Sequence, residues 1–242
     1  MNTIGIVAHS AEGATLCFNT VCREGAKRLG PHMHPQVALS AIPMGLSMAG
    51  WESGEHDTIK RHLLDGIEMV GAAGAGFFVC PDNTAHIVLE KIEREFSIPG
   101  LHIADAVCKE IADHGWIRVG VLGTKWTMNE GIYDTALARL GFTKLVPEEP
   151  ERDAINTAIF DKLCVGIFDS NTTKLFEDAI SKLATRGAEC VVLGCTEIPL
   201  IVDSSNSELP TLDSTRLLAR YAVEHAIDNS GQKGEGAWLR LG

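Results

Sequence analysis

The sequence has no excess of positive charge, no long apolar stretch and no basic N-terminal segment. Its 242 residues include 21 Lys and Arg against 32 Asp and Glu, which gives a formal net charge of −11. Nucleic acids and anionic membrane surfaces repel so acidic a protein, and neither is expected as a partner. No apolar run approaches the roughly 20 residues of a transmembrane helix. The N-terminus argues against a secretory signal.

The seven cysteines follow no spacing typical of disulfides or metal sites. Their number is odd, and a chain of this length can bury a core without covalent cross-links. We therefore expect thiols and a cytoplasmic location. His32 and His34 could share one face of a strand, but no cysteine or carboxylate accompanies them at a recognisable spacing. No metal site is predicted.

The common nucleotide-binding motifs are missing as well. Residues 9–13, which follow the first apolar run, are poor in glycine and lack the Gly-x-Gly-x-x-Gly spacing of a dinucleotide site. The Gly-x-x-x-x-Gly-Lys-Ser/Thr loop of nucleoside triphosphate sites occurs nowhere in the chain. Neither kind of nucleotide site is predicted.

What the chain does contain is a regular alternation of strand and helix patterns, which is typical of a parallel sheet. Strands are expected at 4–8, 36–42, 77–79, 101–103, 116–122, 142–146 and 191–193, and helices at 14–29, 57–73, 86–96, 105–114, 129–140, 154–166, 172–186 and 217–227. Residues 43–54, rich in Met and Gly, are expected to form a flexible flap over a site. Residues 148–153 are expected to be a solvated turn, and residues 229–236 a polar tail.

The chain is organised around residues 191–199 (VVLGCTEIP). The apolar run breaks at Gly194 and places Cys195 and Thr196 at its end, where open α/β sheets bind ligands. A buried small hydrophobe followed by a helix cap is the alternative interpretation of Cys195. A second copy of the arrangement favours a site.

The second copy is found at residues 74–84 (GAGFFVCPDNT), which align with residues 187–197 (GAECVVLGCTE). The alignment sets Asp82 opposite Cys195, an offset of 113 residues. Two further matches keep nearly this offset, and they pair 4–7 with 119–122 and 98–101 with 209–212. Three matched segments in the same order indicate an internal duplication.

The duplication predicts an α/β fold of two similar Rossmann-like domains with parallel sheets, related by a pseudo-twofold axis. The N-terminal domain would comprise residues 1–105 with 212–242, and the C-terminal domain residues 106–211. Asp82 and Cys195 would then lie on opposite walls of an interdomain cleft, which is the predicted active site.

Other polar residues follow the strands on both halves. Ser10 either caps the first helix or turns its hydroxyl towards a ligand, and Thr124 and Thr127 are its counterparts in the second half. His86, four residues beyond Asp82, is either a partner of Asp82 or a first-turn residue of the following helix.

Residues 194–199 (GCTEIP) and 82–86 (DNTAH) resemble motifs of the aspartate/glutamate racemase superfamily, and the resemblance covers nearly the whole chain. It implies a two-domain enzyme that works without pyridoxal phosphate or metal, so no cofactor is expected. Typical members place one cysteine on each side of the substrate α-carbon. One thiolate removes the proton, and the opposite thiol returns one to the other face.

In the family, the amides and hydroxyls that follow each cysteine hold the α-carboxylate. The resemblance gives this role to Asn83, Thr84 and Thr196, with Ser10, Thr124 and Thr127 as weaker candidates, and supporting roles to His86 and Glu197. Donors fixed on the carboxylate are needed because the α-proton is very weakly acidic.

The sequence departs from the family at the first cysteine, which is replaced by Asp82. Cys80 aligns with Leu193 in the second copy and is expected in the core. The reference pKa values of ~3.9 for Asp and ~8.5 for Cys make Asp the weaker base by roughly 6 kcal/mol. Burial could recover part of this difference.

Two further departures concern the substrate side chain. Relatives selective for aspartate resemble one another in a Lys just before a Gly, and Cys164 stands at that place, with Lys162 half a turn away. The Arg that such enzymes use on the distal carboxylate has no match in residues 43–50. Both departures indicate a substrate side chain that is not acidic.

The sequence therefore predicts a racemase or epimerase of an amino acid or related small α-substituted acid, with proton transfer between Asp82 and Cys195. A decarboxylase-type lyase that uses Cys195 alone as proton donor is the first alternative. A non-catalytic protein that binds small acids is the second. A homodimer is expected.

Overall fold

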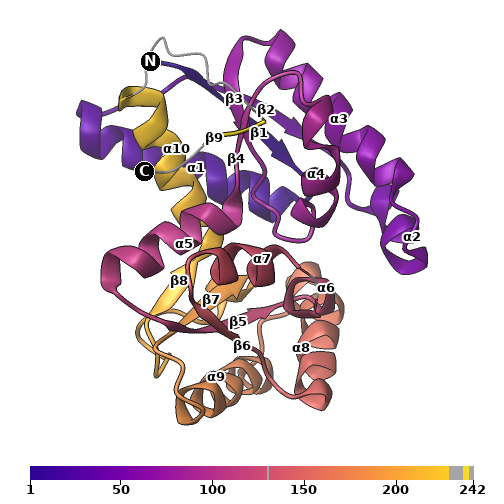
Figure 1. The fold of residues 1–242 in the computed structure, drawn as a ribbon, viewed down its shortest axis with the longest axis vertical. Helices are drawn as coiled ribbons and strands as arrows, with labels where there is room; N and C mark the ends of the chain where they lie inside the picture. Colours follow the sequence, from indigo (N-terminus) through magenta and orange to yellow (C-terminus); the bar gives the residue numbers. More distant parts are fainter. Residues whose placement is uncertain (130, 229–236, 240–242) are drawn as a thin grey trace. The chain divides into compact units, whose positions relative to one another are not determined.

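The computed structural model describes residues 1–129, 131–228 and 237–239. The chain forms two compact units, unit 1 (Met1–Ala106 and Thr215–Gly242) and unit 2 (Val107–Ser214). Each unit contains one parallel sheet flanked by helices (Figure 1). No helix within the described residues is both long enough and apolar enough to cross a membrane. The predicted tail at 229–236 lies outside the described residues.

Unit 1 has a sheet in the order β2-β1-β3-β4-β9. Its strands are β1 (Thr3–Ala8), β2 (Val37–Ala41), β3 (Ala75–Val79), β4 (Gly100–Leu101) and β9 (Trp238–Leu239). Its helices are α1 (Ala11–Leu29), α2 (Gly45–Ser53), α3 (Asp57–Ala72), α4 (His86–Ile92) and the short η1 (Glu93–Glu95). The chain leaves the unit within α5 (Ile103–His114) and returns at the start of α10 (Ser214–Asp228).

Unit 2 has a sheet in the order β6-β5-β7-β8. Its strands are β5 (Arg118–Gly123), β6 (Thr143–Leu145), β7 (Cys190–Gly194) and β8 (Thr211–Asp213). Its helices are α6 (Lys125–Asn129), α7 (Ile132–Arg139), α8 (Glu149–Asp161) and α9 (Ser170–Thr185), with short turns at η2 (Leu163–Val165) and η3 (Ile198–Leu200).

The two sheets repeat one another residue by residue. In unit 1, Ile4 of β1 pairs with Phe77 of β3, and in unit 2, Val119 of β5 pairs with Cys190 of β7. These partners are related by the sequence offsets of 115 and 113. The β3–β4 and β7–β8 ladders correspond in the same way. The predicted α/β fold of two similar domains with parallel sheets is confirmed.

The apolar runs of the sequence become strands because helices cover them. Phe77, Phe78 and Val79 of β3 are fully buried, as expected for a parallel strand with both faces covered. A Cβ added at Gly5 would stand 2.6 Å from Val70, so α3 lies directly on β1. The apolar face of α3 is buried as its periodicity predicts, through Ile59, Leu63, Ile67 and Val70. Burial of each such side chain contributes roughly 1.5–3 kcal/mol to the free energy of unfolding.

The prediction of an irregular flap at residues 43–54 is wrong, because nine of these residues form α2. Leu, Met and Ala favour helix, and the buried Trp51 anchors it. A Cβ at Gly50 would meet the carbonyl oxygen of Glu55 at 2.8 Å, so this glycine allows a close approach of the chain. Gly54, with φ of 75°, ends the helix in the left-handed conformation.

The predicted turn at residues 148–153 is also wrong, since α8 begins at Glu149. A proline in the first turn has no amide hydrogen to leave unpaired, and Glu149 and Glu151 complement the positive end of the helix dipole. The helix predicted at 129–140 is formed as α7 (Ile132–Arg139), and the short α6 (Lys125–Asn129) before it was not predicted. The last strand, β9, was not predicted.

Candidate active site

The turn after β3 in unit 1 is built around Asp82. Oδ1 of Asp82 accepts a hydrogen bond from the backbone N–H of Ala85 at 3.1 Å, so the carboxylate caps the turn that leads into α4. The side chain is 23% exposed. Cys80, two residues earlier, is fully buried, and the expected core position is confirmed. Asn83 is buried and Thr84 is half-buried in the same turn.

His86 holds this turn through hydrogen bonds of both ring nitrogens. Its Nδ1 donates to the carbonyl oxygen of Asp82 at 2.8 Å, and its Nε2 accepts from the N–H of Ile103 at 3.3 Å. Burial, and next the neighbouring His102, hold the pKa of His86 well below its ordinary value. A neutral His86 therefore joins the Asp82 turn to the start of α5.

A second histidine and the last strand complete this support. The ring of His102 lies 4.6 Å from that of His86, with its Nε2 3.1 Å from Oε1 of Glu90. Trp238 of β9 stacks on His86 at 5.8 Å between ring centroids. The C-terminal strand thus holds the histidine that positions the Asp82 turn.

His9 is a site residue that the sequence interpretation missed. It follows β1 and is 1% exposed, and its Nδ1 lies 3.8 Å from Oδ2 of Asp82. Its Nε2 is 3.4 Å from Oγ of Ser47 in α2. Burial lowers the pKa of His9, the charge of Asp82 opposes this shift, and His62 adds to it. The sequence places His9 directly after an apolar strand, and the pairing of β1 with β3 in the sheet brings the carboxyl ends of these strands, and so His9 and Asp82, together.

Ser10 serves as a helix cap. Its Oγ accepts a hydrogen bond from the N–H of Gly13 at 3.0 Å, at the start of α1. Of the two roles that the sequence left open, the structure forms the cap.

In unit 2, Cys195 follows β7 and stands beside a carboxylate. Its Sγ–H donates to Oε2 of Glu197 at 2.8 Å. Burial, and next the charge of Glu197, raise the pKa of the half-buried Cys195 well above its ordinary value. Thr196 and Glu197 are themselves buried. The arrangement keeps a protonated thiol at neutral pH and places an acceptor for its proton next to it.

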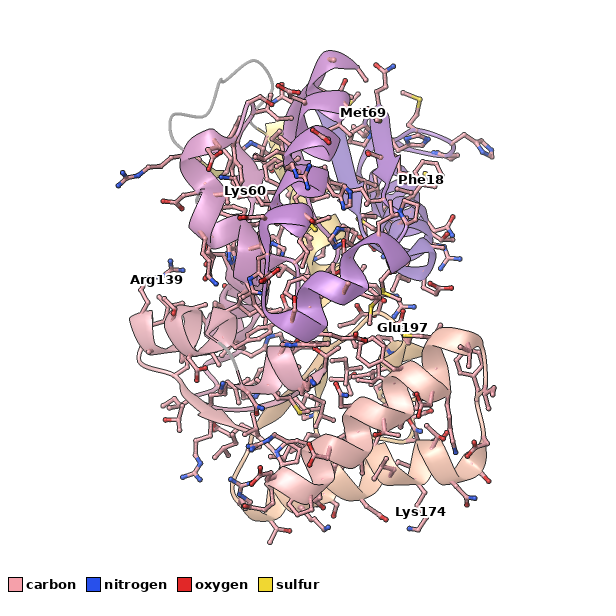
Figure 2. The ribbon with its side chains drawn as sticks, turned by 90° about the vertical axis from the view of Figure 1, so that its right-hand side faces the viewer. Phe18, Lys60, Met69, Arg139, Lys174 and Glu197 are labelled. Atoms are coloured by element: carbon pink, nitrogen blue, oxygen red, sulfur yellow. The ribbon has the colours of Figure 1, made fainter. Side chains whose placement is uncertain are left out.

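Thr124 and Thr127 follow β5, the strand that pairs with β7, and Thr127 lies within α6. Oγ1 of Thr124 accepts from the N–H of Thr127 at 3.2 Å and lies 3.2 Å from its hydroxyl. A Cβ at Gly194 would stand 3.1 Å from the methyl of Thr127 and 2.7 Å from the carbonyl of Leu122. Glycine before Cys195 therefore lets α6 pack against the end of β7. Glu197 lies at the end of unit 2 opposite to the exposed Lys174 (Figure 2).

Cys164 and Lys162 differ in their surroundings. Cys164 packs against the same apolar cluster as Cys195 and lies near enough that its charge would raise the pKa of Cys195 further. The ammonium of Lys162 is bound to Oδ2 of Asp169 at 2.8 Å. The lysine is thus committed to an ion pair at the start of α9.

His32 and His34 lie in an exposed turn, and Nδ1 of His34 faces the carbonyl of Pro35 at 2.8 Å. Neither belongs to β2, so the two histidines do not share a face of that strand. Within the described part of the chain, no three His, Cys, Asp or Glu side chains are grouped to hold a metal ion.

Comparison with known proteins places the fold and the motifs in one family. The chain matches the sequence profile of the Asp/Glu/Hydantoin racemase family over residues 5–222. It is 30% identical over 173 residues to the broad specificity amino-acid racemase RacX of Bacillus subtilis (strain 168), a match that covers 70% of this chain and 73% of that protein.

Solved structures agree with this match. An aspartate racemase homologue from Pyrococcus horikoshii OT3 has a TM-score of 0.80 at 27% identity, and the match covers 93% of this chain and 99% of that chain. An arylmalonate decarboxylase has a TM-score of 0.54 at 15% identity, over 97% of each chain, which shows a shared fold alone.

Proposed function

The chain belongs to the Asp/Glu/hydantoin racemase family, and from this premise we propose that it racemises or epimerises an amino acid or related small α-substituted acid without a cofactor. The observation that carries the proposal is the equivalence of two turns. Asp82 follows the third strand of unit 1, and Cys195 follows the third strand of unit 2, at positions that strand register makes equivalent.

The proposed reaction begins with Asp82 as the base and Cys195 as the acid. Asp82 removes the α-proton from one face of the substrate, and the Sγ–H of Cys195 supplies a proton to the other. That step leaves Asp82 protonated and Cys195 as a thiolate, so in the reverse direction the thiolate removes the α-proton and Asp82 returns one, with the carboxylate of Glu197 2.8 Å from Sγ to hold the thiol whenever it is protonated. Each half-reaction thus has a base and an acid on opposite sides of one carbon.

The intermediate carries negative charge on the α-carboxylate. We assign its stabilisation to Asn83, Thr84 and Thr196, which follow the two acid–base residues directly. Donors held in place by a folded turn need no reorganisation when charge develops, which is the main source of such stabilisation. Thr127 supports the Cys195 turn through its packing on Gly194, and Thr124 holds Thr127 by accepting its backbone N–H.

The substrate side chain is proposed to be neutral. Cys164, and not a lysine, lies near Cys195, and Lys162 is held by Asp169. The half-buried Cys164 has no ammonium group with which to bind a distal carboxylate. Neutral amino acids should therefore react faster than aspartate and glutamate.

The test is deuterium uptake at the α-carbon from heavy water, followed by mass spectrometry and chiral chromatography. An equimolar mixture of the chiral proteinogenic L-amino acids serves as the probe. A racemase incorporates deuterium and forms the D-enantiomer of the same amino acid. Loss of carbon dioxide from a disubstituted malonate, without α-exchange in any amino acid, would support the lyase and overturn this proposal. Binding without either reaction would overturn it too.

A further inference from the structure

The two oxygens of Asp82 have different surroundings. Oδ1 is occupied by the N–H of Ala85 at 3.1 Å, whereas Oδ2 faces Nδ1 of His9 at 3.8 Å. A separation of 3.8 Å is too long for a hydrogen bond. The free oxygen of the carboxylate therefore has an imidazole nitrogen as its neighbour without being neutralised by it.

His9 is held in place from its other side. It is 1% exposed, and its Nε2 lies 3.4 Å from Oγ of Ser47, a fully buried residue of α2. If Nε2 carries the ring proton and donates it to Ser47, the lone pair of Nδ1 points towards Asp82. Burial prevents His9 from touching a substrate, so it can act only through the carboxylate.

We propose that His9 is a positioning residue for Asp82, and that its Nδ1 shares the proton that Asp82 removes from the substrate. The inference rests on the proposed function. The Cα–H bond breaks and its electron pair stays on the substrate. The proton joins Oδ2, and the resulting O–H donates to Nδ1 as the two groups close the 3.8 Å gap. The return step reverses this path.

Such sharing offsets the weakness of aspartate as a base. Free imidazole, with a reference pKa of ~6.5, holds a proton more firmly than an aspartate at ~3.9. A carboxylic acid that donates to a neutral imidazole is more stable than one that does not. The pair is thus a better proton acceptor than the carboxylate alone.

The role requires a neutral His9, and its surroundings provide one. Burial lowers the pKa of His9, and His62 of α3 lowers it further, against the opposing effect of Asp82. Cys80, a further titratable group beside Asp82, is fully buried, and burial raises its pKa well above the ordinary value. As pH falls through the pKa of His9, imidazolium forms, binds the carboxylate and removes the acceptor. Activity should be lost on the acid side.

Two amide variants separate this role from simple packing. In His9→Asn the carboxamide lies where Nδ1 of the imidazole was, next to Asp82. In His9→Gln it lies where Nε2 was, next to Ser47. His9→Gln should lower kcat roughly 10- to 100-fold with KM changed less than about threefold, and His9→Asn should lower it less. In both variants the acid limb of the kcat profile should move to lower pH, because an amide does not titrate. His34→Gln, in an exposed turn, is the matched control.

A His9→Gln enzyme with the parent's kcat and acid limb, or one more active than His9→Asn, would overturn the inference. A second measurement needs no activity. Removing the neighbouring anion by Asp82→Asn should lower the pKa of His9, followed by NMR of the imidazole carbons. An unchanged pKa would show that the two groups are not paired. If the parent exchanges no amino acid, the proposed function and the shared proton both fail, and the NMR shift then decides only the pairing.

Discussion

Asp82 and Cys195 occupy equivalent positions in the two units, but one is a carboxylic acid and the other a thiol. Burial and Glu197 raise the pKa of the Cys195 thiol well above its ordinary value, which keeps the sulfur protonated at neutral pH. Asp82 caps a turn with Oδ1 and has its second oxygen, Oδ2, 3.8 Å from Nδ1 of His9. In the proposed reaction the enzyme therefore starts with one base and one acid, and it needs no proton from solvent to begin a turnover.

Cys195→Ser should remove nearly all exchange activity, at least about 10²-fold, because a hydroxyl is a far weaker acid than a thiol. The fold should be retained, since Ser fits the same space and can donate to Glu197. Heavy-water exchange and a thermal melt check both parts. Cys22→Ser, a half-buried thiol on α1, is the control and should stay active. Near-normal activity of Cys195→Ser would exclude the thiol from the mechanism.

Asp82→Asn separates capping from catalysis. Asn caps turns about as well as Asp, but an amide cannot accept the α-proton. Exchange should vanish while the melting temperature changes little. Asp82→Cys restores two thiols of matched reference pKa and should keep or gain racemisation of a neutral amino acid. Parent-level exchange by Asp82→Asn would reduce Asp82 to a cap and leave Cys195 acting from one face.

At the scale of helices and strands, periodicity predicted α3 and the buried parallel strands, because these elements bury one continuous apolar set. It failed for α2, where the composition of residues 43–54 suggested flexibility and Gly50 in fact permits close packing. The sequence prediction also failed at the start of α8. The acidic residues there suggested a solvated turn, whereas negative charge stabilises the N-terminus of a helix. Local composition does not show what a segment packs against.

The assignment of Ser10 as the N-cap of α1 can be tested by substitution. Ser10→Ala removes the acceptor for the N–H of Gly13 and should cost about 1 kcal/mol of unfolding free energy. Ser10→Asp keeps a cap at the same helix end and should lose little. Denaturant unfolding measures both. A large rise in KM for Ser10→Ala, without loss of stability, would return the hydroxyl to the substrate and contradict the capping assignment.

At the scale of the whole chain, the sequence revealed the duplication because three pairs of matched segments have nearly the same offset. The pairing register of the strands in the two units follows these offsets. The pairing of Asp82 with Cys195 as one site stays a prediction. His9 was missed because its partner in space lies 73 residues away in the chain and no motif marks it. β9 was missed because two residues are too few to show a period, and its pairing with β4 is set by the tertiary fold.

Trp238→Ala should destabilise unit 1 and leave unit 2 unaffected. The indole contacts His86, His102, Phe78 and Phe96, and its loss should cost about 2 kcal/mol, less than a fully buried Trp because it is half-buried. Native-state amide exchange should show faster exchange in β3 and β4 with β5 and β7 unchanged. Trp126→Ala, which removes an indole from unit 2, is the reciprocal control. Equal loss in both units would contradict independent cores.

The pairing of β4 with β9 also has a consequence for biosynthesis. Unit 2 is one unbroken stretch of chain and has left the ribosome complete while unit 1 still lacks its last helix and strand. Until residues 237–239 emerge, the N–H of Gly100 has no Ala237 carbonyl to bind, and β4 is an open edge. Open edges are where nascent chains pair wrongly with one another. Released chains that end before β9 should therefore be the ones that a chaperone protects, while unit 2 of the same chains is native.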